Sequence, residues 1–158
     1  MPELESRHYL QACHFLRELG VNQPQEEGKD VLGVIVEVGM KDGVDLIVGY
    51  SDHHARYYNY SGAAIIWEKP DSTLDASIDV LLQAGQAVVR AIGPWKESRP
   101  PAPRTGNARI NLLTPSGLHF GEGPYDALWK DPMGRPLLAA AYRLMHELIE
   151  LTKRRGKD

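Results

Sequence analysis

Residues 31–68 read VLGVIVEVGMKDGVDLIVGYSDHHARYYNYSGAAIIWE, a stretch in which short apolar runs alternate with turn residues. Val34, Val36 and Val38 share one face of the first run, and Ile35 and Glu37 share the other, because side chains alternate along a strand. The turns leave no room for a crossover helix, so successive strands must pair antiparallel. The stretch therefore predicts a four-stranded meander, with strands over residues 34–40, 44–50, 56–60 and 63–68.

Two local signals mark how this meander turns and how it ends. Asp42-Gly43 is predicted to supply the positive backbone angles of a tight hairpin between the first two strands. Ser72 followed by Asp75 resembles a capping box, with aspartate in place of the usual glutamate. We expect a helix to begin here and to pack on the sheet.

The apolar stripe of that helix runs from Leu74 to Ile92 and ends at Gly93-Pro94, a glycine cap followed by proline. Ala84 and Gly85 lie within the stripe and are small enough to allow a close approach to the sheet. Residues 109–114 and 118–120 then predict a second hairpin, and the Gly-Pro-rich residues 121–134 predict turns and a connection.

Helices are predicted at both ends of the chain. Residues 9–19 form an amphipathic pattern that Gly20 would close, and residues 137–151 form an apolar stripe that begins after Pro136. The resulting order is α-ββββ-α-ββ-α, a two-layer α+β fold with an antiparallel sheet and helices mainly on one face. The same succession of elements occurs in profilin-like domains and in small secretion chaperones, which is an analogy of element order without matched residues.

Composition predicts one globular domain over residues 1–158, with 42% hydrophobic and 25% charged residues. A net charge of −3 and a pI near 6.1 give no field that would attract nucleic acid or an anionic membrane, so neither is expected as a partner. Cys13 is the only cysteine, which excludes an intrachain disulfide and a thiolate metal cluster. Neither a signal peptide nor a membrane span is recognisable, so we expect a cytoplasmic protein.

Aromatic residues and arginine anchor protein interfaces, because they bury large rigid areas and keep a polar group. They are concentrated in the third predicted strand and recur on two Pro-Gly-rich loops. Packing within the sheet is the alternative interpretation of the strand residues. The candidate binding residues are Arg56, Tyr57, Tyr58, Tyr60, Trp67, Trp95 and Trp129.

Asp52-His53-His54 places a carboxylate beside two imidazoles, which suits metal binding or proton transfer. Adjacent strand residues point to opposite faces, so the two histidines alone cannot easily hold one ion. His119 and Glu122 of the second hairpin would complete such a site if the hairpins lay side by side. An ordinary polar turn is the alternative interpretation, and the glycines around Glu122 lack the spacing of a phosphate-binding loop.

Three functions are compatible with these patterns. The first is a non-catalytic binding or adaptor domain without a cofactor, whose partner is another protein or a second copy in a homodimer that covers a sheet edge. The second is a small metal-assisted hydrolase built on Asp52, His53, His54, His119 and Glu122. The third is a small-molecule sensor with a pocket between sheet and helices, lined by Tyr58, Tyr60 and Trp67. No nucleophilic motif is present, so the binding domain ranks first.

Overall fold

A computed structural model describes residues 30–95 and 101–156 of the chain. The helix predicted over residues 9–19 lies outside these residues. The strands are β1 (Gly33–Met40), β2 (Gly43–Tyr50), β3 (Ala55–Tyr58), β4 (Ala64–Trp67), β5 (Asn107–Thr114) and β6 (Gly117–Pro124). The helices are α2 (Asp75–Ala91), α3 (Tyr125–Lys130) and α4 (Gly134–Arg155).

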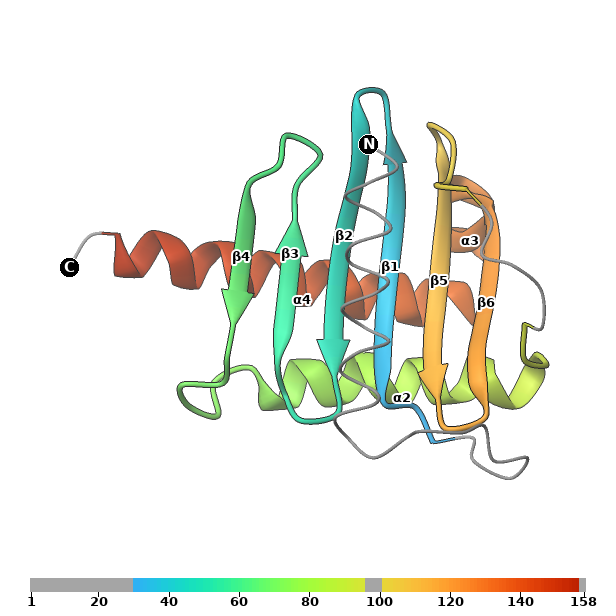
Figure 1. Ribbon diagram of the computed structural model, residues 1–158, viewed down its shortest axis with the longest axis horizontal. Coiled ribbons are helices and arrows are strands. Elements are labelled where there is room, and N and C mark those ends of the chain that lie inside the picture. The colour runs from blue at the N-terminus through green and yellow to red at the C-terminus, as the bar shows by residue number, and fades with distance from the viewer. Residues whose placement is uncertain (1–29, 96–100, 157–158) are drawn as a thin grey trace.

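The six strands form one antiparallel sheet in the order β4-β3-β2-β1-β5-β6 (Figure 1). The meander occupies β1 to β4, and the second hairpin joins it on the free side of β1. Val36 of β1 lies opposite Ile47 of β2 and Ile110 of β5, so three apolar side chains meet on one face. The predicted α+β fold with an antiparallel sheet is confirmed.

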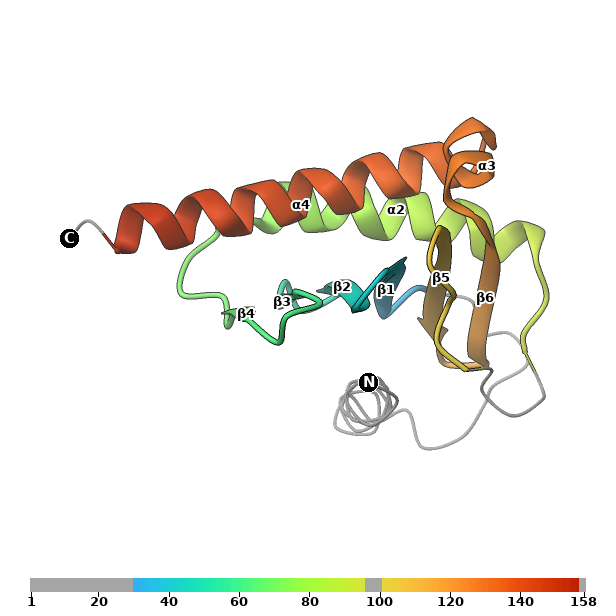
Figure 2. The ribbon, with the colours of Figure 1, turned by 90° about the horizontal axis from the view of Figure 1, so that it is seen from above.

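Both long helices lie across the same face of the sheet (Figure 2). Val34 and Val36 of β1, Ile78 of α2 and Leu144 of α4 are fully buried in the core between the two layers. Burial of each such side chain contributes roughly 1.5–3 kcal/mol to folding. The apolar face of β1 and the apolar stripes of α2 and α4 therefore pack against one another in this core.

The opposite face carries a second buried apolar cluster of Ile35, Leu46, Val48, Tyr50 and Leu113. None of α2, α3 and α4 lies on this side (Figure 2). The same face also holds charged side chains, which the register brings into one row across β1, β5 and β6.

The segment predicted as a Gly-Pro-rich connection is more regular than expected. Gly121 and Gly123 continue β6 as far as Pro124, because they pair with Ile110 and Ala108 of β5. The short helix α3 follows directly. Pairing between strands therefore overrides the turn preference of glycine here, and Pro124 is tolerated because it ends an edge strand.

Three further boundaries differ from the sequence prediction. Strands β3 and β4 are shorter than predicted, with four residues each. The capping box does not form: Leu74 is the N-cap of α2 without a side-chain hydrogen bond, and Asp71 instead accepts one from the Thr73 amide at 2.8 Å. The first hairpin turns at Lys41-Asp42, whose φ angles are not positive, and Gly43 is already the first residue of β2. None of the described helices combines the length and apolar character needed to cross a bilayer.

Candidate functional site

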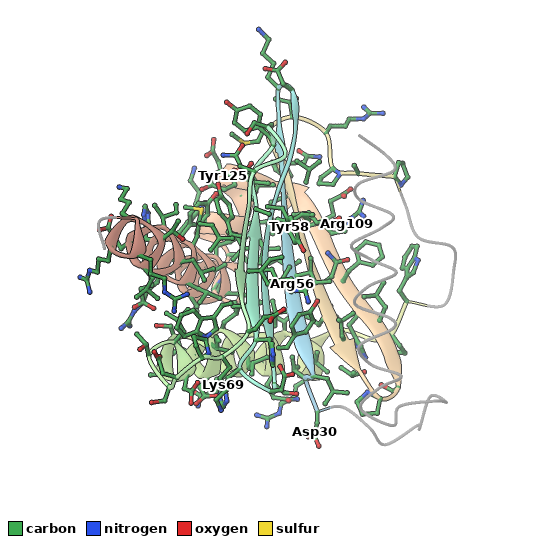
Figure 3. The ribbon with its side chains drawn as sticks, turned by 60° about the vertical axis from the view of Figure 1, so that its left-hand side comes forward. Asp30, Arg56, Tyr58, Lys69, Arg109 and Tyr125 are labelled. Carbon is green, nitrogen blue, oxygen red and sulfur yellow. The ribbon has the colours of Figure 1, made fainter. Side chains whose placement is uncertain are left out.

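The predicted aromatic residues do not share one surface. Arg56 and Tyr58 lie on the face away from the helices (Figure 3), where Arg56 donates a hydrogen bond to the Tyr58 hydroxyl at 3.3 Å. Tyr57 and Trp67 point to the helix-covered face and are buried in the core. Tyr60 is exposed in the turn between β3 and β4. Since Tyr58 and Trp67 face opposite sides of the sheet, they do not line the pocket expected of a sensor.

The two loop tryptophans lie apart from these residues. The Trp95 ring packs edge-on against Phe120, with ring centroids 4.6 Å apart, and its amide donates to the Leu118 carbonyl at 2.6 Å. Trp129 is half-buried in α3 beside Tyr142, at 5.9 Å between centroids. Trp95 therefore covers part of β6, and Trp129 belongs to an aromatic cluster between α3 and α4.

The histidines proposed for a metal site each have a different partner. His54 Nδ1 lies 2.8 Å from Asp52, and His53 Nε2 lies 2.8 Å from Asp79 of α2. His119 is buried on the helix-covered face of β6, where Nδ1 lies 3.1 Å from the Ile92 carbonyl oxygen.

Glu122 lies on the other face of β6 from His119, and β1 and β5 separate that strand from the turn that bears His53. Neighbouring strands are about 4.8 Å apart, so these side chains cannot share an ion. Within the described ranges, no three His, Cys, Asp or Glu side chains are placed to hold a metal. The ligand set of the proposed hydrolase is not assembled.

No sequence pattern indicated which side chains lie beside His53. His53 has a φ of +67° and Lys69 a φ of +53°, both in the left-handed region that few residues with a β-carbon adopt. Asp75 lies between them, 3.9 Å from His53 Nδ1 and 3.6 Å from Lys69 Nζ. The cluster ties the turn after β2 and the end of β4 to the first turns of α2.

Glu122 has a structural partner on the face away from the helices. Arg109 is 1% exposed and lies 3.0 Å from Glu122 and 3.3 Å from the fully buried Glu37. Asn111 donates to Glu37 at 2.9 Å. Removing one member of a buried ion pair strongly destabilises the folded protein, because the other charge is left buried without a partner. This row is therefore an integral part of the fold.

The edge of β4 is the feature that bears most directly on binding. Along an antiparallel pair, residues alternate between hydrogen-bonded and non-hydrogen-bonded positions. The Asn59 amide donates to the Ala63 carbonyl at 2.8 Å, and this register makes Ile65 the next hydrogen-bonded residue of β4. The N–H and C=O groups of Ala64 and Ile66 therefore point away from β3 toward the open edge of the sheet, where no strand of the described ranges pairs with β4 and the Ile66 side chain is 51% exposed.

The other edge of the sheet differs from this one. The outward carbonyl of Leu118 in β6 accepts the Trp95 amide, and Pro124 has no N–H to offer. The charged Glu122 stands on the same strand. Charge, proline and a covering segment are the usual protections of an edge strand, and β6 has all three while β4 contains none of them between Ala64 and Trp67.

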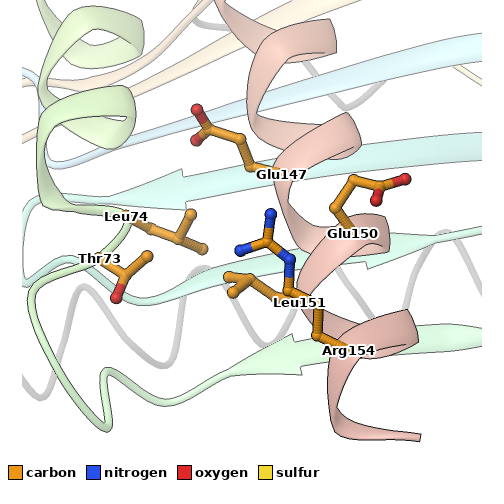
Figure 4. A pocket seen from close by; sticks show the side chains of 6 residues that line it. All are labelled: Thr73, Leu74, Glu147, Glu150, Leu151 and Arg154. Atoms are coloured by element: carbon orange, nitrogen blue, oxygen red, sulfur yellow. The ribbon is translucent and has the colours of Figure 1, made fainter. Parts of the chain in front are cut away.

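Helix α4 extends past β4, so its last turns overhang the open edge (Figure 1). The Arg155 guanidinium lies 5.4 Å from the centroid of the Trp67 ring, which fixes this end of the helix above the end of β4. Close by, a cavity of about 170 Å³ opens between the start of α2 and the end of α4 (Figure 4). Its lining residues are Thr73, Leu74, Glu147, Glu150, Leu151 and Arg154.

The charges in this cavity are unequally satisfied. Glu147 accepts a hydrogen bond from Ser77 at 2.5 Å, and Glu150 pairs with Lys153 at 3.3 Å. Arg154 points between the two helices (Figure 4) and has no ion pair within residues 30–95 and 101–156. Within the described residues, Arg154 is thus the charged side chain of this lining that has no ion-pair partner, and it stands beside the two carboxylates of Glu147 and Glu150.

Asp71, which precedes α2, already has partners. Hydrogen bonds from Thr73 lower the pKa of Asp71, and the charge of Arg155 lowers it further. Asp71 thus stays ionised and offsets part of the charge of Arg155.

Comparison with protein-family models, curated proteins and solved structures finds no match to this chain. The open edge of β4, the overhanging end of α4 and the Arg154 cavity are consequently the features from which a function can be argued.

Proposed function

We propose that this domain is a non-catalytic protein-binding module that takes up an extended segment of another protein as a seventh strand beside β4. The observation that carries the proposal is the unprotected edge, where Ala64 and Ile66 direct backbone donors and acceptors outward. An extended segment added to a sheet edge gains main-chain hydrogen bonds, and side-chain pockets beside the edge supply specificity.

The surroundings of β4 determine the chemistry of the partner segment. The exposed Ile66 side chain favours an apolar residue on the face away from the helices. The overhanging end of α4 carries Lys153, Arg154 and Arg155, and this basic end favours a carboxylate on the other face. The fitting segment therefore alternates apolar and acidic side chains.

Photo-crosslinking in the native host tests this directly. A benzophenone amino acid is placed at Ile66 and, as the matched control, at Val80, an exposed apolar residue of α2. We expect a defined segment of a second protein to be crosslinked at position 66 alone. A synthetic peptide of that segment is then titrated onto the purified domain, with amide hydrogen exchange as the readout.

The peptide should slow exchange at Ala64 and Ile66 and leave the amides of β6 unchanged. Ile66→Pro removes an outward N–H that β3 does not use, so the domain should fold while peptide affinity falls about tenfold. Ile66→Val keeps both the N–H and a β-branched apolar side chain, and should bind within about twofold of the parent. Equal crosslinking at both positions, or protection that appears elsewhere, would refute the proposal.

A third outcome decides between partners. If the crosslinked segment is β4 of a second copy, the edge is a homodimer interface, and the proposal that the partner is a different protein is wrong. The same Ile66→Pro substitution would then convert the dimer to a monomer in analytical ultracentrifugation.

A further inference from the structure

A second cavity lies at the other end of the sheet, where β1 ends. It has a volume of about 390 Å³, within the range of roughly 300–1,000 Å³ that is usual for small-molecule sites. Tyr125, which is labelled near this end of the sheet in Figure 3, contributes one wall from the start of α3. The complete lining is Val38, Gly39, Met40, Gly106, Tyr125, Asp126 and Tyr142.

Aromatic rings form one side of this cavity. The Tyr125 and Tyr142 rings lie 6.3 Å apart between centroids at an interplanar angle of 84°. Trp129 packs behind them, 6.1 Å from Tyr125 and 5.9 Å from Tyr142. The three rings hold one another in place, so the aromatic wall is preformed before any ligand arrives.

The charge of the lining is negative. Asp126 is the one formally charged residue among those that line the cavity, and it makes no ion pair with any described residue. Asp45 stands nearby on β2, where it accepts hydrogen bonds from the Tyr60 amide at 2.7 Å and the Tyr57 hydroxyl at 3.4 Å. Neither carboxylate is neutralised by a basic side chain in the described ranges.

Tyr142 and Tyr57 remain neutral in this environment. Burial raises the pKa of Tyr142 well above its usual value, and the neighbouring Tyr125 and the charge of Asp45 raise it further. Burial and Asp45 likewise raise the pKa of Tyr57. Neutral phenol rings keep the electron-rich faces that attract cations.

From this arrangement we infer that the cavity binds a small organic cation of the methylated ammonium class. Such a cation combines a positive charge, which Asp126 attracts, with methyl groups that pack against the rings of Tyr125 and Tyr142 and the thioether of Met40. A bare metal ion would require several oxygen ligands at about 2.0–2.6 Å, and no such group is assembled among the described residues. An anion would be repelled by Asp126.

Binding of choline, measured by calorimetry and by Trp129 fluorescence, provides the test. The control ligand is 3,3-dimethylbutan-1-ol, which has the same shape and no charge. We expect saturable one-to-one binding of choline, and at least about tenfold weaker binding of the neutral alcohol. Equal affinity for the two ligands, or no saturable binding of choline, would overturn the inference.

Variants of the domain distinguish the contribution of the Asp126 charge to choline binding from that of the Tyr142 ring. Asp126→Asn should weaken choline binding several-fold, whereas Glu68→Gln, at an exposed carboxylate on the opposite end of the sheet, should not change it. Tyr142→Phe keeps the ring and should bind choline, while Tyr142→Leu should lose it with an unchanged circular dichroism spectrum. If Tyr142→Leu does not fold, Asp126→Asn decides alone, and unchanged affinity in that variant contradicts the inference.

Discussion

Gly85 of α2 offers the sharpest test of how the helices rest on the sheet. A β-carbon built at Gly85 would lie 2.9 Å from Val34 Cγ2 and 2.9 Å from Leu112 Cδ2. Carbon atoms in contact are normally about 3.5–4.0 Å apart, so Gly85→Ala forces a shift of several tenths of an ångström. Val34 and Leu112 are fully buried, and the β-branched Val34 has little rotamer freedom on its strand.

Two opposing effects set the size of the change in stability. Alanine in place of glycine inside a helix stabilises by about 0.5–1 kcal/mol, whereas overpacking a core costs about 1–3 kcal/mol. We therefore expect Gly85→Ala to lower the free energy of unfolding by about 1–2 kcal/mol, measured by urea denaturation with circular dichroism. Ala87→Gly, at an exposed position of the same helix, measures the propensity effect alone and should cost about 1 kcal/mol.

A double-mutant cycle shows whether the contact with Val34 causes the loss. In a Val34→Ala background one of the two obstructing atoms is gone and only Leu112 Cδ2 remains, so Gly85→Ala should cost less than it does in the parent protein. A stabilising Gly85→Ala in the parent protein would contradict the close approach of α2. An equal cost in both backgrounds would show that Val34 is not the obstacle.

Two further predictions concern buried polar groups. Arg109→Met should lower the free energy of unfolding by about 3–5 kcal/mol, because the buried Glu37 loses the guanidinium that faces it, and adding Glu37→Leu should recover much of that loss in the same denaturation assay; a single-variant loss below about 1 kcal/mol would contradict this. The raised pKa of Tyr142, caused first by burial and then by Tyr125, means that the folded state binds the phenolic proton more tightly than the unfolded state. Stability should therefore be intact below pH ~10 and fall as the pH rises above that value, and Tyr142→Phe should show a flatter pH profile; parallel profiles for the two proteins would be the contrary result.

The sheet could be predicted because its faces are encoded locally. Val34, Val36 and Val38 alternate with Ile35 and Glu37, and that alternation alone assigns the residues to two faces. The stripes of α2 and α4 then match the face that carries the three valines. Such periodicity depends on side chains close together in the sequence, so it needs no knowledge of distant contacts.

The extension of β6 could not be predicted in this way. Gly121, Gly123 and Pro124 each favour turns, and only their pairing with β5 makes this segment a strand. The same limit applies to the candidate sites. Alternation separates Tyr57 from Tyr58, but it does not reveal which face the helices cover.

Each of the two proposed sites is formed by segments that lie far apart in the sequence, so no short sequence motif indicated it. The aromatic cavity combines the end of β1, the turn at Gly106 and the start of α3 with Tyr142 of α4. Tyr142 follows Leu138 by four residues and precedes Met145 by three, so periodicity places it next to the apolar stripe but does not show that its ring lines a cavity. The open edge likewise depends on the sheet order. Strand β4 is an edge strand because β5 pairs with β1 and not with β4.

Helix α4 carries a residue of each site and so fixes their relation. Arg154 follows Tyr142 by about 18 Å along the same helix, at a rise of ~1.5 Å per residue. Sites this far apart that share no contacts normally act additively, within about 0.3–0.5 kcal/mol. A domain that does not bind choline could therefore still bind a segment beside β4. A domain that does not bind a segment beside β4 could likewise still bind choline.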